Sequence, residues 1–379
     1  MSEQPKVRIA VIGVGVMGSS HVRDIATRLP AAELAAVCDI IPERADRYAA
    51  EYHAPAYYDS RSLLSQADLD AVVIATPHYA HTTLSLAAFQ RGLHVLTEKP
   101  LAAHARDGRL MLEAHAQARL TKPGLQFAIM FQMRTQGVWQ KVKQMLETGE
   151  LGKLQRVTWI ITDWFRPQSY YDNGGWRATW KGEGGGVLLN QCPHNLDLYQ
   201  WLFGMPRRVA GFAHLGKYHR IEVEDEVTGY FEHDDGLVGH FITTTAESPG
   251  TNRLEIAGEL GKLVVEDDKL TFTRNKLSTF EFIRTSPKPF DHVECQVEAV
   301  PIPPSPESGY VAVFTAFTSA ILHGGQLVVE ASEGLKGLTL GNAIMLSSFL
   351  GRPVEMPFDE QAYADKLQEL IQASEGARP

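Results

Sequence analysis

The feature that most constrains this chain is a glycine-rich turn that directly follows a short apolar run near the N-terminus. Residues 7–12, VRIAVI, have the length and the β-branched content of a buried strand, and residues 13–18 are GVGVMG. The amphipathic residues 19–29 that follow complete the order of strand, turn and helix found in units that bind a dinucleotide. This start predicts a parallel α/β domain at the N-terminus.

Each glycine of the turn has a separate physical role. Gly13 permits the tight turn, Gly15 lets backbone N–H groups approach a pyrophosphate, and Gly18 lets the helix lie close to the sheet. The phosphates would lie at the helix N-terminus, where unpaired N–H groups and the macrodipole favour an anion. The predicted cofactor-binding residues of the turn are Gly13, Gly15, Val16, Met17 and Gly18. A purely structural turn is the alternative.

An acidic residue follows at the spacing that such a unit requires. Residues 34–38 form a second apolar run that ends at Asp39, 21 residues after Gly18, and about 20 is the spacing of the ribose-binding carboxylate. A carboxylate at this place accepts hydrogen bonds from the ribose hydroxyls and repels a 2′-phosphate. Asp39 therefore predicts NAD rather than NADP as the cofactor.

Length and composition exclude several classes of protein. The 379 residues suggest two domains, and 44% hydrophobic residues provide for real cores. A formal charge of −9 without a long basic run argues against nucleic acid and anionic membranes as partners. We find no apolar run long enough to span a membrane and no signal peptide. The three distant cysteines (38, 192 and 295) argue against a disulfide framework or a metal site, and predict a cytoplasmic protein.

The α/β pattern continues to about Lys122, where we place the domain boundary, with domains of 1–123 and 124–379. The C-terminal helices of the second domain can pack back on the first. We predict helices at 42–53, 60–67, 81–91 and 105–118, and strands at 71–75, 94–97 and 125–131. Thr76 and Pro77 end one strand, and Glu98 and Lys99 end the next. Both pairs would lie at the carboxyl edge of a parallel sheet, which is where ligands bind.

The second domain has a different pattern, with a helix at 136–148 followed mainly by strands. The predicted strands are 155–162, 208–215, 226–233, 237–245, 252–258, 261–266 and 269–273, and the predicted helices after them are 310–323, 331–350 and 359–374. Short turns between successive strands indicate a largely antiparallel sheet. Its outer face would need covering, so we expect a homo-oligomer with sheets packed face to face.

Lys99 is the first candidate for catalysis. Its ammonium could hydrogen-bond a substrate hydroxyl and stabilise the alkoxide character that develops as hydride leaves carbon. A surface salt bridge with Glu98 is the alternative, although adjacent residues at the end of a strand usually diverge.

Residues 184–197, GGGVLLNQCPHNLD, contain the second candidate group. If they are helical, Asn190, His194 and Asp197 lie on one face. His194 could take the proton of the alcohol as a general base, while Asn190 and Asp197 could orient the imidazole or contact sugar hydroxyls. The alternatives are a core or capping histidine, and Asn190 as an N-cap with Pro193 in the first turn.

The third candidate is an aromatic and polar stretch over residues 163–180. Flat aromatic faces beside hydrogen-bonding groups suit carbohydrate rings, so we predict substrate contacts from Trp164, Tyr171, Trp176 and Arg177. Such residues are also enriched in oligomer contacts, which is the competing explanation.

Over nearly its whole length the chain resembles the Gfo/Idh/MocA oxidoreductases. The motifs that carry the resemblance are the glycine turn, Ala75-Thr76-Pro77 with His81, Glu98-Lys99-Pro100, Arg134, residues 149–152 (GELG), and residues 184–186 (GGG) with His194 and Asp197. The resemblance implies an N-terminal Rossmann domain with a doubly wound parallel sheet, and a C-terminal α/β domain with a large, mostly antiparallel sheet. It also implies dimers or tetramers.

By the same resemblance, Lys99 is the catalytic lysine and His194 the catalytic histidine. Thr76, Pro77, His81 and Glu98, together with Lys99, would lie at the cofactor, and Arg134 at the substrate. Many members have Asp where this chain has Asn190, and Asn cannot carry the negative charge that a dyad with histidine uses.

Together these features predict an NAD-dependent oxidoreductase that takes hydride from a secondary hydroxyl of a sugar, glycoside or cyclic polyol. A redox-neutral glycoside hydrolase is the alternative, in which bound NAD oxidises the sugar to a transient ketone and is then regenerated. A non-catalytic NAD-binding sensor is a third possibility.

Overall fold

The computed structural model describes residues 5–173 and 175–377. Its backbone contacts divide the chain into two compact units. Unit 1 comprises residues 1–135, 181–184 and 306–339, and unit 2 comprises residues 136–180, 185–305 and 340–379. The chain therefore returns to unit 1 twice after residue 135.

Unit 1 contains a six-stranded sheet in which every pair of neighbours is parallel. The strand order is β3-β2-β1-β4-β5-β6, which reverses direction beside β1, as in Rossmann sheets. The strands are β1 (Val7–Ile12), β2 (Ala32–Cys38), β3 (Ala56–Tyr57), β4 (Ala71–Ile74), β5 (His94–Thr97) and β6 (Phe127–Ile129). The predicted parallel α/β domain is confirmed, and β6 closes its sheet.

Helices cover the central strands of unit 1. Val22 and Ile25 of α1 (Val16–Arg28) and Phe314 and Phe317 of α10 (Gly309–His323) form one core with Ile9 and other strand residues, while α4 and α5 contact each other. The remaining helices are α2 (Pro42–Tyr52), α3 (Ser60–Gln66), α4 (His78–Gln90), α5 (Ala105–Thr121), the 3-10 turn η1 (Gln132–Thr135) and the start of α11 (Ala331–Leu350). Successive residues of β1 are buried, as a central parallel strand requires.

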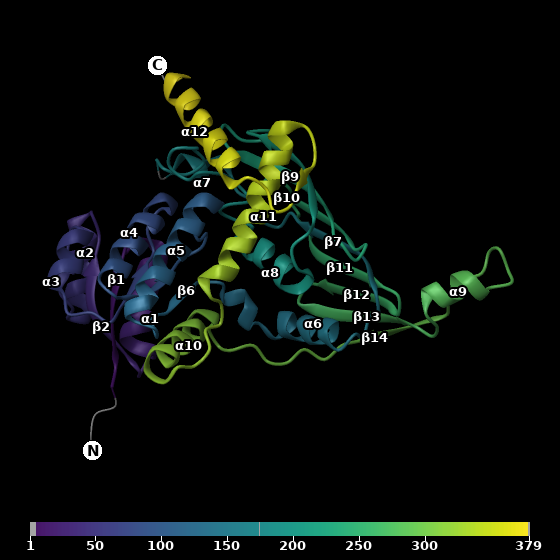
Figure 1. The fold of residues 1–379 in the computed structure, drawn as a ribbon, viewed down its shortest axis with the longest axis horizontal. Coiled ribbons are helices and arrows are strands. Elements are labelled where there is room, and N and C mark those ends of the chain that lie inside the picture. Colours follow the sequence, from purple (N-terminus) through teal and green to yellow (C-terminus); the bar gives the residue numbers. More distant parts are fainter. Residues whose placement is uncertain (1–4, 174, 378–379) are drawn as a thin grey trace. The chain divides into compact units, whose positions relative to one another are not determined.

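Unit 2 contains a nine-stranded sheet, and Figure 1 shows its long central strands side by side. All pairs of neighbouring strands in this sheet are antiparallel, except for the parallel pair of β7 and β10. In order the strands are β14 (Cys295–Ala299), β13 (Lys269–Asn275), β12 (Gly261–Glu266), β11 (Asn252–Gly258), β7 (Leu154–Ile161), β10 (Val238–Thr244), β9 (Glu224–Glu232), β8 (Arg208–Leu215) and β15 (Val354–Glu355). The predicted large, mostly antiparallel sheet is confirmed.

One face of this sheet forms the core of unit 2. Trp159, Phe231, Phe241 and Phe272 point into it and are fully buried, whereas their neighbours along the strands are half-exposed. Tyr199 packs edge-to-face on Phe231, with ring centres 4.8 Å apart. Unit 2 also contains α6 (Gly137–Glu147), α7 (Gln168–Asp172), α8 (Pro193–Phe203), α9 (Thr279–Thr285) and α12 (Glu360–Ala377).

Two helix starts differ from the predictions for a local physical reason. Helix α4 begins at His78 rather than His81, because Pro77 serves as its N-cap. Helix α8 begins at Pro193, with Cys192 as N-cap, so the proposed helical face of Asn190, His194 and Asp197 was wrong for Asn190. Pro193 disfavours the helical conformation for the residue before it, Cys192. This separates the turn at 187–191 from α8. Helix α9 and strand β14 were not predicted.

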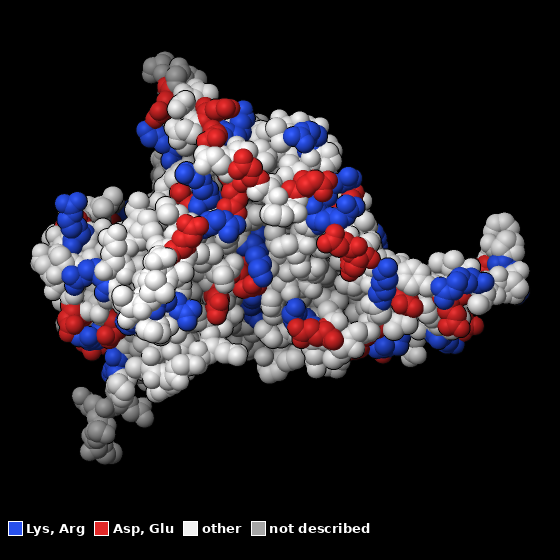
Figure 2. All heavy atoms as spheres, viewed as in Figure 1, with Lys and Arg blue, Asp and Glu red and all other residues white. Residues whose placement is uncertain are grey.

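In the described part of the chain, we find no helix that is both long and apolar enough to cross a bilayer. Figure 2 shows acidic and basic side chains interspersed over the face that it draws, without a large field of one sign.

Candidate active site

The glycine turn of unit 1 is as tight as its sequence suggests. Gly13 has a φ of +86°, and a Cβ on it would lie 2.8 Å from the carbonyl oxygen of Ala75 at the end of β4. A Cβ on Gly18 would overlap the carbonyl oxygen of Gly13. A Cβ on Gly15 would meet no atom within 4 Å. Two glycines thus permit close backbone contact, and the third leaves open space above the turn.

Asp39 is held rigidly at the end of β2. Its Oδ2 accepts the N–H of Val14 in the glycine turn at 2.9 Å, and its Oδ1 accepts the N–H of Ile41 at 2.9 Å. The residue is only 7% exposed. Each carboxylate oxygen has a second lone pair, so both can still accept a hydrogen bond from a ribose hydroxyl.

Three further observations fit a dinucleotide along this edge of the sheet. The N-terminus of α1 has neither a capping side chain nor an acidic residue in its first turn, and the positive end of such a helix favours an anion. Val16 and Ile40 are 84% and 85% exposed, which offers apolar contacts beside the turn and beside Asp39. In the described part of the chain, the buried Oγ1 of Thr76 has no hydrogen-bond partner. The residues present therefore suit NAD.

We expect Asp39→Ala to weaken NAD binding by about 10- to 100-fold, since hydrogen bonds to a charged group contribute about 1.5–3 kcal/mol. The loss for NADP should be smaller, because the change also removes a repulsive charge. Fluorescence titrations with NADH and NADPH measure both affinities. Glu33→Ala on β2 is the matched control, since this acid is exposed and lies before the strand end. An unchanged ratio of the two affinities would contradict the assigned role.

Glu98 and Lys99 lie at the end of β5, and Glu98 is fixed from two sides. His21 of α1 donates from Nε2 to Glu98 Oε1 at 2.7 Å, and the backbone N–H of Lys99 donates to Oε2 at 3.0 Å. Burial alone would raise the pKa of Glu98, but the hydrogen bond and charge of His21 and the charge of Lys99 outweigh it and lower the pKa. Glu98 is thus a buried carboxylate that orients the backbone from which Lys99 extends.

The structure places His81 beneath the same edge of the sheet. It is fully buried, and its two ring nitrogens lie 2.8 and 2.9 Å from the carbonyl oxygens of Pro100 and Thr76. Burial lowers the pKa of His81. His78, one turn earlier, lies with Nδ1 2.9 Å from the carbonyl oxygen of Glu183. Both nitrogens of His81 thus face backbone groups that join the ends of β4 and β5, and its predicted cofactor contact stays a prediction.

In unit 2, His194 is the second residue of α8 and is 8% exposed. Asp197, three residues further on the same helical face, is buried and accepts a hydrogen bond from Gln200 at 3.2 Å. Asn190 lies in the preceding turn, where its N–H donates to the carbonyl oxygen of Gly186 at 2.9 Å. His194 therefore lies in the first turn of α8, and Asn190 lies before it.

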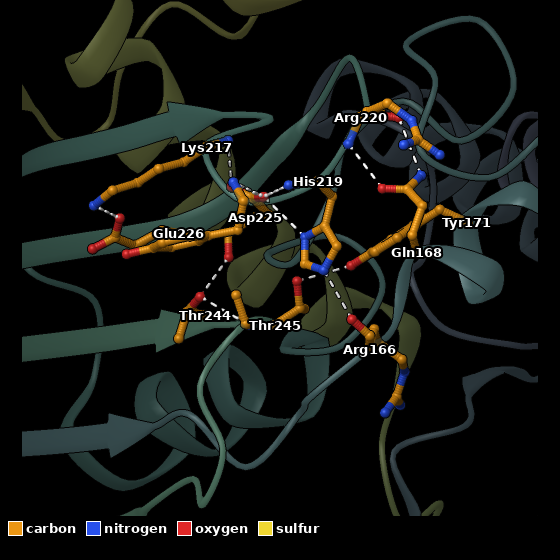
Figure 3. A network of polar contacts seen from close by, with 12 residues as sticks. Arg166, Gln168, Tyr171, Lys217, His219, Arg220, Asp225, Glu226, Thr244 and Thr245 are labelled. Carbon is orange, nitrogen blue, oxygen red and sulfur yellow. Dashed lines mark hydrogen bonds and ion pairs between the residues drawn. The ribbon is translucent and has the colours of Figure 1, made fainter.

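The predicted aromatic segment also belongs to unit 2. Tyr171 Oη donates to Thr245 Oγ1 at 2.8 Å, and its ring packs against His219 with centres 4.9 Å apart (Figure 3). Trp164, Trp176 and Arg177 are each half-buried. The structure thus places Tyr171 beside the residue that follows β10, and the contacts of all four residues with substrate stay predictions.

Comparison with known proteins identifies both parts of the chain. Residues 7–121 match the model of an oxidoreductase family with an NAD-binding Rossmann fold, and residues 139–264 match the GFO/IDH/MocA C-terminal domain. The chain belongs to the Gfo/Idh/MocA oxidoreductase family. The predicted family, fold and NAD cofactor are thereby confirmed.

The relatives of this Gfo/Idh/MocA protein include named polyol dehydrogenases. It is 24% identical over 307 residues to scyllo-inositol 2-dehydrogenase (NAD(+)) of Bacillus subtilis, covering 76% of this chain and 83% of the relative. It is 26% identical over 361 residues to inositol 2-dehydrogenase 3 of Saccharopolyspora erythraea, covering 89% and 99%. The WlbA dehydrogenase of Bordetella pertussis, solved with NADH and UDP-GlcNAcA, superposes with a TM-score of 0.78 at 27% identity, covering 93% and 100%.

Arg134 is not at the surface of this Gfo/Idh/MocA chain. It lies in η1, is 5% exposed, and its Nη2 is 3.4 Å from Glu333 Oε2 of α11, within unit 1. Its predicted contact with substrate stays a prediction, and the structure shows it joining two distant segments of unit 1.

Sequence reasoning missed one buried pair in this family member. Asp225 is fully buried and accepts from the backbone N–H groups of Lys217, Tyr218 and His219, and its Oδ2 lies 3.0 Å from His219 Nδ1 (Figure 3). His219 Nε2 in turn donates to the carbonyl oxygen of Arg166 at 2.8 Å. The only sequence signal was a histidine six residues before an acid on a strand, and that spacing is too common to single out.

Proposed function

We propose that this enzyme transfers a hydride from a secondary hydroxyl of a sugar, glycoside or cyclic polyol to NAD, with Lys99 and His194 as its catalytic residues. The observation that carries the proposal lies within unit 1. The glycine turn follows β1, Lys99 follows β5, and Ile12 and Thr97, the last residues of these strands, both pair with Ile74 of β4. The cofactor turn and Lys99 therefore lie at the same carboxyl edge of one sheet.

The chemistry assigned to Lys99 follows from its charge and its support. NAD, when bound, supplies the hydride acceptor. The ammonium of Lys99 hydrogen-bonds the reacting hydroxyl and stabilises negative charge on its oxygen as the hydride leaves carbon. The buried carboxylate of Glu98, held by His21, keeps the backbone of Lys99 in place.

His194 is proposed as the group that takes the hydroxyl proton. The first turn of a helix disfavours additional positive charge, so this position suits the neutral, proton-accepting imidazole. Asp197 on the same face supplies a carboxylate one turn away. We propose that Asn190, which lies in the preceding turn, contacts substrate hydroxyls instead of orienting the imidazole.

We further propose that the enzyme is a cytoplasmic homodimer or homotetramer. The outer face of the nine-stranded sheet is half-exposed and includes apolar residues such as Ile160 and Ile242, which supports an association of two sheets. In the described part of the chain none of the three cysteines forms a disulfide, and burial raises the pKa of the Cys38 thiol to about 12, which suits a reducing compartment. Sedimentation of the purified protein measures the assembly.

A panel of sugars, glycosides and cyclic polyols tests the activity. With excess NAD, we expect at least one compound to produce NADH stoichiometrically with its ketone, and glycoside cleavage should not exceed NADH formation. Cleavage without net NADH would support the redox-neutral hydrolase instead. Nucleotide binding without turnover of any compound would support the sensor.

A further inference from the structure

Two arginines of unit 2 are stacked on the same tyrosine ring. The guanidinium carbons of Arg166 and Arg177 lie 5.1 and 5.0 Å from the centre of the Tyr170 ring. Arg166 also lies 5.5 Å from the Trp164 ring, and Arg177 lies 5.0 Å from the Trp176 ring. We call these five residues the arginine–aromatic cluster. Two positive charges in it are at most about 10 Å apart.

The cluster has more donors than acceptors. Within residues 5–173 and 175–377, neither guanidinium has a carboxylate oxygen within 4.0 Å, and their hydrogen bonds go to the backbone oxygens of Phe165 and Asn173. In the same part of the chain, the buried Trp164 Nε1 and Arg177 Nε have no acceptor. By contrast, arginines 156, 207, 208, 253 and 274 of unit 2 each pair with a glutamate.

The backbone that carries Arg166 is fixed. Its N–H donates to the carbonyl oxygen of Thr245 at 2.8 Å, and its carbonyl oxygen accepts from His219, which is held by Asp225. Figure 3 shows the guanidinium of Arg166 pointing away from His219. Because both backbone groups are bonded, the cation is positioned before any ligand binds, which lowers the entropic cost of binding.

The cluster is linked to the segment that carries the proposed base. Gln191 Nε2 donates to Tyr170 Oη at 3.5 Å, and Gln191 is buried three residues before His194. A substrate whose hydroxyl is deprotonated by His194 could therefore place another of its groups against the positive charge of the cluster.

We propose that the arginine–aromatic cluster binds an anionic group, a carboxylate or a phosphate, carried by the sugar or polyol substrate. The inference rests on the proposed function and narrows its substrate class. Guanidinium groups bind carboxylates and phosphates through paired N–H donors, and an anion also relieves the repulsion between the two cations. The tryptophan and tyrosine rings supply apolar faces for the C–H groups of the same molecule.

Matched ligands in the presence of NADH test the proposal by calorimetry. The probes are glucose, galactose and mannose, the three corresponding uronates and the three 6-phosphates. We expect at least one uronate or 6-phosphate to bind about 10- to 100-fold more tightly than its neutral parent. This difference in affinity should become smaller at high salt. Arg166→Gln and Arg177→Gln should each lower this preference at least about tenfold. Arg220→Gln, whose guanidinium lies 3.9 Å from Asp172, is the control and should retain it.

The outcomes separate the alternatives. Preference for the uronates identifies a carboxylate, and preference for the 6-phosphates identifies a phosphate. If no anion binds more tightly than its parent, or if both variants weaken neutral and anionic ligands equally, the cluster only packs the segment and the inference is wrong. A preference for anions without NADH formation from any of the nine compounds and NAD would count against the proposed hydride transfer while leaving the anion site intact.

Discussion

Replacing Lys99 by Met should lower kcat/KM for the best substrate by about 1,000-fold, the range typical of a lost proton-transfer or charge-stabilising group. Met has nearly the length and volume of Lys but no charge and no donor, so the variant removes the proposed chemistry with little change in shape. NAD affinity should change by less than about tenfold, since at most one hydrogen bond to the cofactor is lost.

Steady-state rates and NADH titrations measure both quantities on the same preparations. Lys6→Met, which removes an exposed charge from unit 1 before β1, is the control and should match the wild type. A kcat/KM within tenfold of the wild type would exclude Lys99 from the chemical step. A fall in NAD affinity as large as the fall in kcat/KM would assign Lys99 to cofactor binding instead.

Local patterns predicted the elements of the sheet edge well. Strand β5 was predicted at its observed bounds, because a buried run between Gly92 and Pro100 leaves little choice of length. The glycine turn and Asp39 likewise lie at the strand ends that the sequence assigned. These features depend on neighbours in sequence, and each has a steric or electrostatic reason that the residues themselves supply.

Contacts between distant segments could not be predicted in the same way. No local pattern shows which of the C-terminal residues pack in unit 1, here 306–339, or that His21 of α1 supports Glu98, 77 residues later. The pair of His219 and Asp225 fixes Arg166 through a backbone oxygen, which leaves no trace in side-chain patterns. Pro193 marks the first turn of α8, but the local pattern does not show that Cys192 rather than Asn190 is the N-cap. The residues that hold a site in place are therefore set by tertiary contacts, whereas its motifs can be recognised from local sequence.

Two glycine substitutions in one turn should separate folding from cofactor binding. In Gly18→Ala the new methyl group overlaps the carbonyl oxygen of Gly13, and this backbone atom cannot rotate away as a side chain could. We expect the free energy of unfolding to fall by about 3 kcal/mol, the upper end of ordinary overpacking, with loss of NAD binding. Urea unfolding without nucleotide measures the first effect.

Gly15→Ala should have the opposite profile. Its φ of −68° is accessible to alanine and its new methyl group meets no protein atom within 4 Å, so stability should be unchanged or raised by up to about 1 kcal/mol. The methyl group occupies the space that we assign to the pyrophosphate, so NAD affinity should fall at least about tenfold, or ~1.4 kcal/mol. Because this variant should fold normally, its NAD affinity reports directly on the space above the turn. An affinity equal to that of the wild type would show that the pyrophosphate does not lie there.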